Sequence, residues 1–149
     1  MSTVSTHARG LAFAAWLALV ALAGCAQAPP AAQTLTSSAV TRLPQPWPTA
    51  ATVAGDAPPR ILAVYVNRTT IGNGDEWRGR IVTSTNVASL EVRTESFSFV
   101  AARTAFGQFT FDVHVLDLPP QYRRGYMLQI TARNTAGARD DRYVPIRFL

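Results

Sequence analysis

From about Arg60 onward, hydrophobic and polar residues alternate along the chain in short segments. A period of two places successive side chains on opposite faces of a β-strand, so this alternation predicts strands with one buried face. In residues 108–115, the clearest case, every odd-numbered side chain is apolar and every even-numbered one is polar. The segments predicted as strands are 61–67, 76–84, 87–95, 97–101, 108–115, 126–133 and 143–149. No segment keeps a helical period, so residues 60–149 are predicted to form one all-β domain, an antiparallel β-sandwich of about seven strands.

The last of these strands carries a proline in its middle. Val144, Ile146 and Phe148 are predicted to face the core, and Pro145 lies among them. Proline has no N–H to donate to a ladder, so it favours an edge position. The segment 143–149, with Tyr143 at its start, is therefore a candidate edge for pairing with another chain.

A different pattern precedes the strands. Residues 11–23 form an unbroken apolar run of 13 residues after a polar start that carries Arg9. A membrane-spanning helix needs about 20 apolar residues, so this run is too short to span. Its length and flanks are typical of the hydrophobic region of a secretory signal.

The end of this run resembles the bacterial lipobox, an aliphatic residue and two small residues before a cysteine: Leu22, Ala23, Gly24, Cys25. In lipoproteins of that family a diacylglycerol is attached to the cysteine sulfur, and a signal peptidase then cuts before the cysteine. The resemblance implies a signal peptide over residues 1–24, a lipid anchor on Cys25 and a location in the cell envelope, attached to a bacterial membrane. The alternatives are an ordinary secretory signal with a chance cysteine, and an uncleaved anchor.

Residues 25–59 are rich in alanine, proline, threonine and serine, and their apolar residues show no period. Such a segment buries too little apolar surface to offset the entropy of ordering it. We expect a disordered, proline-stiffened tether between the anchor and the domain.

Composition limits the stabilising chemistry and the partners. Cys25 is the only cysteine, so no intramolecular disulfide is available and the domain depends on its apolar core. The 14 basic residues are all arginine, and loss of Arg9 with the signal peptide changes the net charge from +5 to +4. A basic surface outside the cytoplasm suits a protein partner or an anionic cell-wall or glycan polymer, and no nucleic acid is expected.

The segment from Leu118 to Gly137 resembles the sixth strand and following hairpin of fibronectin type III and bacterial immunoglobulin-like modules. The similarity rests on a Tyr-x-Leu-x-Ile-x-Ala-x-Asn pattern beginning at Tyr126. It implies an immunoglobulin-like sandwich in which the Tyr126 hydroxyl bonds back to the preceding corner.

Few residues suggest catalysis or metal binding. Asp112 and His114 share one strand face with Thr110. One alternative is that they serve a small metal-dependent or carbohydrate-active enzyme module, but the face opposite a core ordinarily carries solvated polar side chains. Asp140 and Asp141 are the best calcium candidates, but Arg139 and Arg142 flank them and favour a solvated hairpin loop. The sequence predicts no metal site, no cofactor and no enzyme activity.

Arg123 and Arg124 lie between Tyr122 and Tyr126 and form the most local basic and aromatic cluster. This cluster would suit a sugar or an anionic polymer, and with Tyr143 it is the candidate partner surface. The function expected is binding or spacing within the cell envelope, with an accessory subunit of an envelope complex as the alternative.

Overall fold

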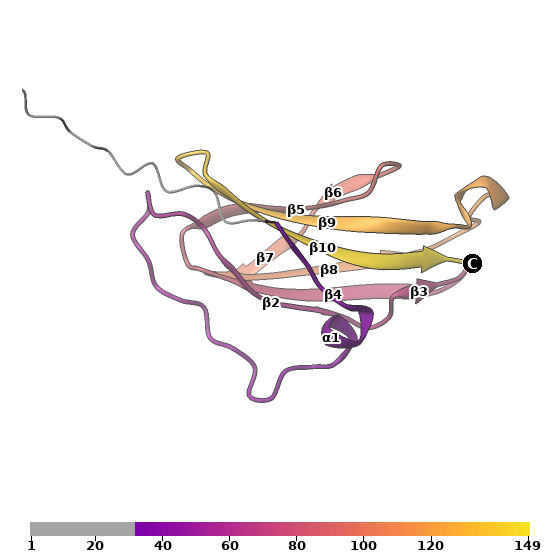
Figure 1. Cartoon of the computed structure of the whole chain (residues 1–149), viewed down its shortest axis with the longest axis horizontal. Coiled ribbons are helices and arrows are strands. Elements are labelled where there is room, and N and C mark those ends of the chain that lie inside the picture. The colour runs from indigo at the N-terminus through magenta and orange to yellow at the C-terminus, as the bar shows by residue number, and fades with distance from the viewer. Residues whose placement is uncertain (1–31) are drawn as a thin grey trace, which may run out of the picture.

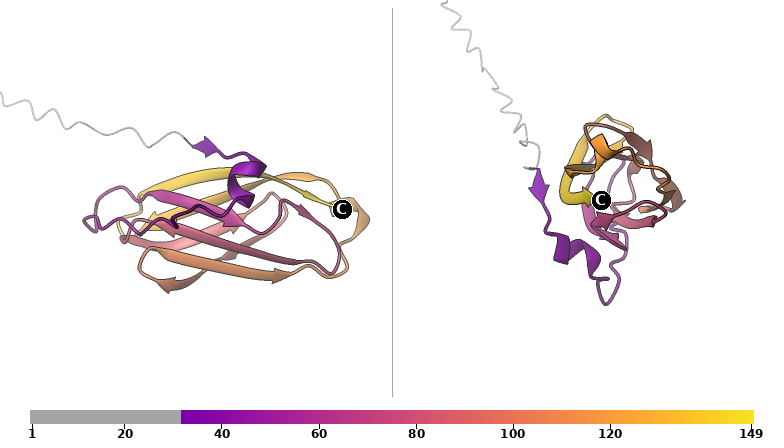
Figure 2. Two further views of the ribbon diagram at one scale, coloured as in Figure 1. Left: turned by 90° about the horizontal axis from the view of Figure 1, so that it is seen from below. Right: turned by 90° about the vertical axis from the view of Figure 1, so that its right-hand side faces the viewer.

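The computed structural model describes residues 32–149 and shows an all-β fold of two sheets packed face to face (Figure 1). The elements in chain order are β1 (Gln33–Thr34), α1 (Ser37–Thr41), β2 (Ile61–Val66), β3 (Thr70–Ile71), β4 (Glu76–Thr83), β5 (Val87–Arg93), β6 (Ser98–Val100), β7 (Ala102–Ala105), β8 (Gln108–His114), the 3₁₀ turn η1 (Pro120–Tyr122), β9 (Gly125–Asn134) and β10 (Arg139–Phe148). Viewed along and across the strands, the molecule is an elongated sandwich with loops gathered at its two ends (Figure 2).

One sheet has the order β1-β10-β9-β5-β6, with β3 also paired to β10, and the other has the order β2-β4-β8-β7. All pairs are antiparallel except β1 and β3, which both run parallel to β10. Each of the seven predicted strands corresponds to a strand of the structure. The sequence did not predict β1, β3 or β7, which are two to four residues long and too short to show alternation.

The predicted inward faces are confirmed. Trp77, Phe109, Leu128 and Ile130 are at most 1% exposed and lie in the core between the sheets. Thr131, which the alternation places outward, is only 2% exposed because it lies beside Asp141 on the outer face and donates a hydrogen bond to it. A period of two therefore identifies the core, but not every buried position.

The structure corrects the predicted extent of the tether. Residues 33–59, which we call the N-terminal wrap, lie against the sandwich, forming β1, α1 and a long loop (Figures 1 and 2). Thr36 caps α1 by accepting a hydrogen bond from Ala39 N–H, and α1 places Val40 in the core with 1% exposure. Val40 is the apolar anchor that holds this part of the wrap to the domain.

Polar groups of the body hold the rest of the wrap. Thr85 N–H donates to the Ala51 carbonyl, and the amide side chains of Asn86 and Asn134 both donate to the Ala57 carbonyl. The Arg80 guanidinium lies 4.4 Å from the centre of the Trp47 ring. These contacts join residues far apart in sequence, so a local reading of composition does not predict them.

The wrap also changes the predicted free edge at β10. Leu35 N–H donates to the Tyr143 carbonyl and Arg147 N–H donates to the Thr69 carbonyl, so chain segments from the same molecule cover both parts of this edge. Pro145 lies in the gap between them, where its missing N–H costs no ladder bond. The prediction that Pro145 marks an edge position, and that residues 143–149 form an open edge, is wrong, because β1 and β3 pair with β10 on the side away from β9.

Candidate functional site

A hollow lined by aromatic side chains lies at the end of the sandwich that holds β3, η1 and the carboxyl terminus, on the right in Figure 1. It consists of two adjoining cavities of about 240 and 300 Å³ that share Phe97, Leu118 and Phe148. Tyr122 and Tyr126 also line the first cavity. Trp77, Phe99 and Leu116 line the second. We call this pair of cavities the aromatic groove.

Edge-to-face contacts hold the rings of the groove in place. Phe148 packs against Phe97, Tyr126 and Trp77 with ring centres 5.9, 5.6 and 6.3 Å apart. Such pairs add about 0.5–1.5 kcal/mol each beyond the area they bury. Leu116 and Tyr122 remain 67% and 41% exposed at the mouth of the groove. The groove therefore has a rigid aromatic floor and an apolar rim that solvent reaches.

A neighbouring turn positions the loop that carries Leu116 and Leu118. Asn73 accepts a hydrogen bond from Leu118 N–H at 2.8 Å, and Gly74 N–H donates to the Val115 carbonyl at 2.7 Å. The turn itself is closed by Asp75, which accepts a hydrogen bond from Gly72 N–H at 2.7 Å. This bond, and the paired Arg68 guanidinium, hold the pKa of Asp75 below its usual value, so the turn keeps its charge in mild acid.

The predicted cluster of basic and aromatic residues forms part of the rim. Arg123 Nε donates to the Leu118 carbonyl at 3.2 Å, and the Arg124 guanidinium lies 5.0 Å from the centre of the Tyr126 ring. The Tyr126 hydroxyl accepts a hydrogen bond from Arg124 Nε, and this bond together with the charge of Glu95 raises the pKa of Arg124. The hydroxyl therefore bonds to a side chain two residues upstream, whereas the resemblance implied a bond back to the corner.

Asp112 and His114 lie on the outer face of the other sheet, as the alternation predicted. They do not form a catalytic pair, because the Arg78 guanidinium binds the Asp112 carboxylate at 2.9 Å and also pairs with Glu76. These two carboxylates, Asp112 foremost, raise the pKa of Arg78. An exposed carboxylate held by an arginine is a surface ion pair, and this arrangement does not orient His114 as a base.

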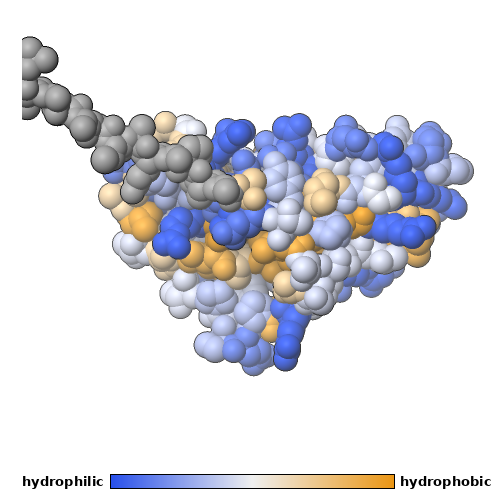
Figure 3. All heavy atoms as spheres, in the orientation of Figure 1, coloured by the Kyte–Doolittle hydropathy of each residue, from blue (hydrophilic) through white to orange (hydrophobic). Residues whose placement is uncertain are grey.

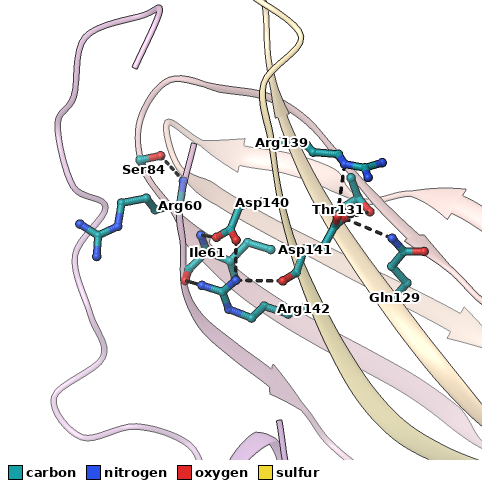
Figure 4. A network of polar contacts seen from close by, with 9 residues as sticks. All are labelled: Arg60, Ile61, Ser84, Gln129, Thr131, Arg139, Asp140, Asp141 and Arg142. Atoms are coloured by element: carbon teal, nitrogen blue, oxygen red, sulfur yellow. Dashed lines mark hydrogen bonds and ion pairs between the residues drawn. The ribbon is translucent and has the colours of Figure 1, made fainter. Parts of the chain in front are cut away.

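Asp140 and Asp141 do not lie in a solvated hairpin loop, which corrects the sequence interpretation. Both belong to β10, and Asp140 is 2% exposed (Figure 4). Asp140 accepts hydrogen bonds from Ile61 N–H at 2.7 Å and from Arg142 Nη1 at 2.5 Å, while Arg142 Nη2 also donates to the Ile61 carbonyl. The ion pair of Asp140 and Arg142 thus joins β10 in one sheet to the start of β2 in the other.

Asp141 points to the opposite face of β10. Its carboxylate accepts hydrogen bonds from Thr131 at 2.6 Å and from Gln129 at 3.2 Å, and pairs with Arg139 at 3.4 Å (Figure 4). Both carboxylates are thus bound by donors of the protein itself, and the two carboxylates lie on opposite faces of the strand. Among residues 32–149, no three His, Cys, Asp or Glu side chains are grouped closely enough to hold a metal ion.

The remaining predicted site residues fall elsewhere. Tyr143 lies on β10 opposite Thr34 of β1, so the structure does not bring it together with Arg123 and Arg124. Leu22, Ala23, Gly24 and Cys25 lie outside the described residues. The sequence reading missed Phe97, Phe99 and Phe148 as site residues, because alternation identifies them only as core positions.

No protein-family model matches the chain, and no curated protein matches its sequence. Within residues 32–149, neither helix has the length and apolar character that crossing a bilayer requires. The case for function therefore depends on the residues themselves.

Proposed function

We propose that this chain is a membrane-anchored lipoprotein of the cell envelope whose sandwich domain binds a partner and catalyses no reaction. The observation that carries the proposal is the aromatic groove. The groove lies at the end of the domain opposite the hairpin between β9 and β10, and β1 begins on the side of that hairpin. An anchor at Cys25 would attach the chain at one end and leave the groove exposed at the other.

The strand order supports an immunoglobulin-like module as the fold family. The sheets β2-β4-β8-β7 and β10-β9-β5 follow the orders that the two sheets of such sandwiches have, ABED and GFC. Modules of this kind recognise partners through the loops gathered at their ends. The groove lies among such loops, at one end of β9 and β10.

The chemistry of the groove favours a polypeptide partner that inserts an apolar side chain. Its lining is mainly aromatic and aliphatic, and the lining residues at hand to hydrogen-bond the hydroxyls of a sugar are Ser96, Ser98, His114 and Tyr122. Arg123 at the rim suits an acidic residue beside the inserted side chain, whereas the neighbouring Arg124 is already paired with Glu95. A glycan or an anionic cell-wall polymer is the competing partner.

A selection of displayed peptides against the mature chain carrying Cys25→Ser tests this proposal. We expect enriched peptides with an aromatic or aliphatic anchor next to acidic residues, and Tyr122→Ala should raise their Kd by about tenfold or more. Thr135→Ala, at an exposed turn far from the groove, is the matched control and should leave the Kd unchanged. Enrichment without this common pattern, or binding that Tyr122→Ala leaves intact, would exclude the groove as the binding site.

Detergent-phase partitioning tests the anchor separately. The wild-type chain should enter the detergent phase. Cys25→Ser, made with an ordinary cleavable secretory signal in place of residues 1–24 so that no apolar run remains, should stay in the aqueous phase, because no acyl chain can be attached to it. Ala26→Ser, one residue beyond the proposed anchor, serves as the control and should partition like the wild type. A Cys25→Ser chain that still partitions with detergent contradicts the lipid anchor.

A further inference from the structure

The N-terminal wrap determines how far the domain can stand from a membrane. Only seven residues, 26–32, separate Cys25 from Gln33, the first residue of β1. Fully extended chain spans at most about 3.6 Å per residue, so the eight steps from Cys25 to Gln33 cover less than about 30 Å. A tether reaching to residue 59 would have allowed a span about four times as long.

The direction of β1 shows from which end the described chain enters the domain. Gln33 is opposite Arg142 and Thr34 is opposite Tyr143 in a parallel pair, so β1 begins on the side of the Arg139 end of β10. That end contains the hairpin after β9, the loop after β4 and the turn between β7 and β8, on the left in Figure 1. We call it the tether-proximal end.

Side chains at the tether-proximal end combine positive charge with an exposed aromatic ring. Arg60 and Arg139 are exposed, Arg133 is half-buried, and Arg103 bonds to the Val87 and Ala88 carbonyls at the same end. The facing acids are Asp56, which is exposed, and Asp141, which pairs with Arg139 at 3.4 Å and accepts hydrogen bonds from Thr131 and Gln129.

Phe106 lies in the turn between β7 and β8 and is 73% exposed. The Arg103 guanidinium lies 5.9 Å from the centre of its ring. The turn is held to the β4 end by a bond from Thr83 N–H to the Gly107 carbonyl, so the ring is presented from a fixed base. Exposed aromatic rings beside arginines are typical of surfaces that lie at the headgroup level of a bilayer.

We propose that the tether-proximal end is a membrane-facing surface, on which Arg60, Arg133 and Arg139 contact anionic lipid headgroups and Phe106 enters the interface. This inference rests on the proposed anchor at Cys25. The short span brings the end to the bilayer, and the excess of arginine favours a surface containing anionic lipid. The aromatic groove at the opposite end then faces away from the membrane.

Photo-crosslinking in vesicles tests the orientation. The lipidated chain would carry p-benzoylphenylalanine in place of Phe106 or, as the matched control, in place of Tyr122 at the opposite end. In vesicles of equal parts phosphatidylglycerol and phosphatidylcholine, lipid adducts should form at position 106 and be about tenfold fewer at position 122. Arg60→Gln with Arg133→Gln and Arg139→Gln should lower the adducts at position 106 in these vesicles and not in pure phosphatidylcholine.

Lengthening the tether is the second test, and it leaves the folded part unchanged. Inserting about 30 glycine and serine residues after Gln27 should reduce the adducts at position 106 about tenfold, because effective concentration falls as roughly the −3/2 power of linker length. Equal labelling at positions 106 and 122 in the short-tethered chain overturns the membrane-facing surface, while the anchor stands if the vesicles still float with the protein. Flotation of the mature Cys25→Ser chain with pure phosphatidylcholine vesicles, which carry no anionic lipid for the arginines, would instead refute the anchor itself.

Discussion

Asp140→Ala is expected to lower the free energy of unfolding by about 3–5 kcal/mol, the range seen when one partner of a buried ion pair is removed. Asp140 is 2% exposed and accepts hydrogen bonds from both the Arg142 guanidinium and the Ile61 N–H. Without the carboxylate, an arginine whose side chain is only 13% exposed loses its counter-charge, and a buried backbone N–H loses its acceptor. Urea unfolding followed by circular dichroism measures the change.

Two further variants separate the buried pair from charge in general. Asp112→Ala removes the exposed partner of Arg78 and should cost about 1 kcal/mol or less, as exposed ion pairs do. Asp140→Asn combined with Arg142→Met keeps an acceptor for Ile61 and removes both charges, so it should recover a large part of the loss. If Asp140→Ala costs no more than Asp112→Ala, the pair does not join β2 to β10 as described.

The same residues show the limit of reading charge from sequence. In sequence, Asp140 and Arg142 belong to a run of four charged residues beside a turn, two acids flanked by two arginines, a pattern typical of solvated hairpins. Their burial arises because β2 begins beside β10 and the wrap crosses the same side, and both facts depend on contacts more than 70 residues apart along the chain. The strands themselves were predictable because alternation is a local signal of a half-buried surface.

For the N-terminal wrap, composition predicted disorder, whereas the structure shows an ordered segment packed on the domain. Few residues of the wrap are apolar and buried: Val40, which is 1% exposed, and Pro59 at its end. Asn86 and Asn134 from the body satisfy carbonyl groups that a tether would leave to water. The one local signal was Thr36 followed by Ser37, Ser38 and Ala39, a helix-capping pattern that anticipates α1.

The aromatic groove was predictable only in part. Arg123, Arg124 and Tyr126 were recognised as a basic and aromatic cluster from their neighbourhood in sequence, and the structure places the two arginines at the rim and Tyr126 in the floor. The floor combines Phe97 beside β6 with Phe148 of β10, whose proximity is set by the order of strands in the sheets. A cavity is a property of how elements are assembled, so a pattern of single strands cannot show it.

Gly79→Ala is expected to lower the free energy of unfolding by about 3 kcal/mol, at the upper end of the usual cost of overpacking a core. Gly79 faces the core from the middle of β4, directly opposite Phe111 of β8. A Cβ at Gly79 would lie 2.0 Å from Phe111 Cε1 and 2.3 Å from its Cζ, well inside van der Waals contact. The ring has little room to move, because it packs against Trp77 and Phe99 with centres 4.9 and 5.3 Å away.

The backbone offers no easy relief either, because β4 is hydrogen-bonded to β2 on one side and β8 on the other. Shrinking the ring should therefore rescue the variant: Phe111→Leu combined with Gly79→Ala should cost less than the sum of the two single changes, with a coupling of about 1–3 kcal/mol. Gly55→Ala is the matched control, since nothing lies within 4 Å of its added Cβ, and it should change stability by less than about 1 kcal/mol. If the effects of Gly79→Ala and Phe111→Leu are additive, the Phe111 ring does not need the space that Gly79 leaves for it.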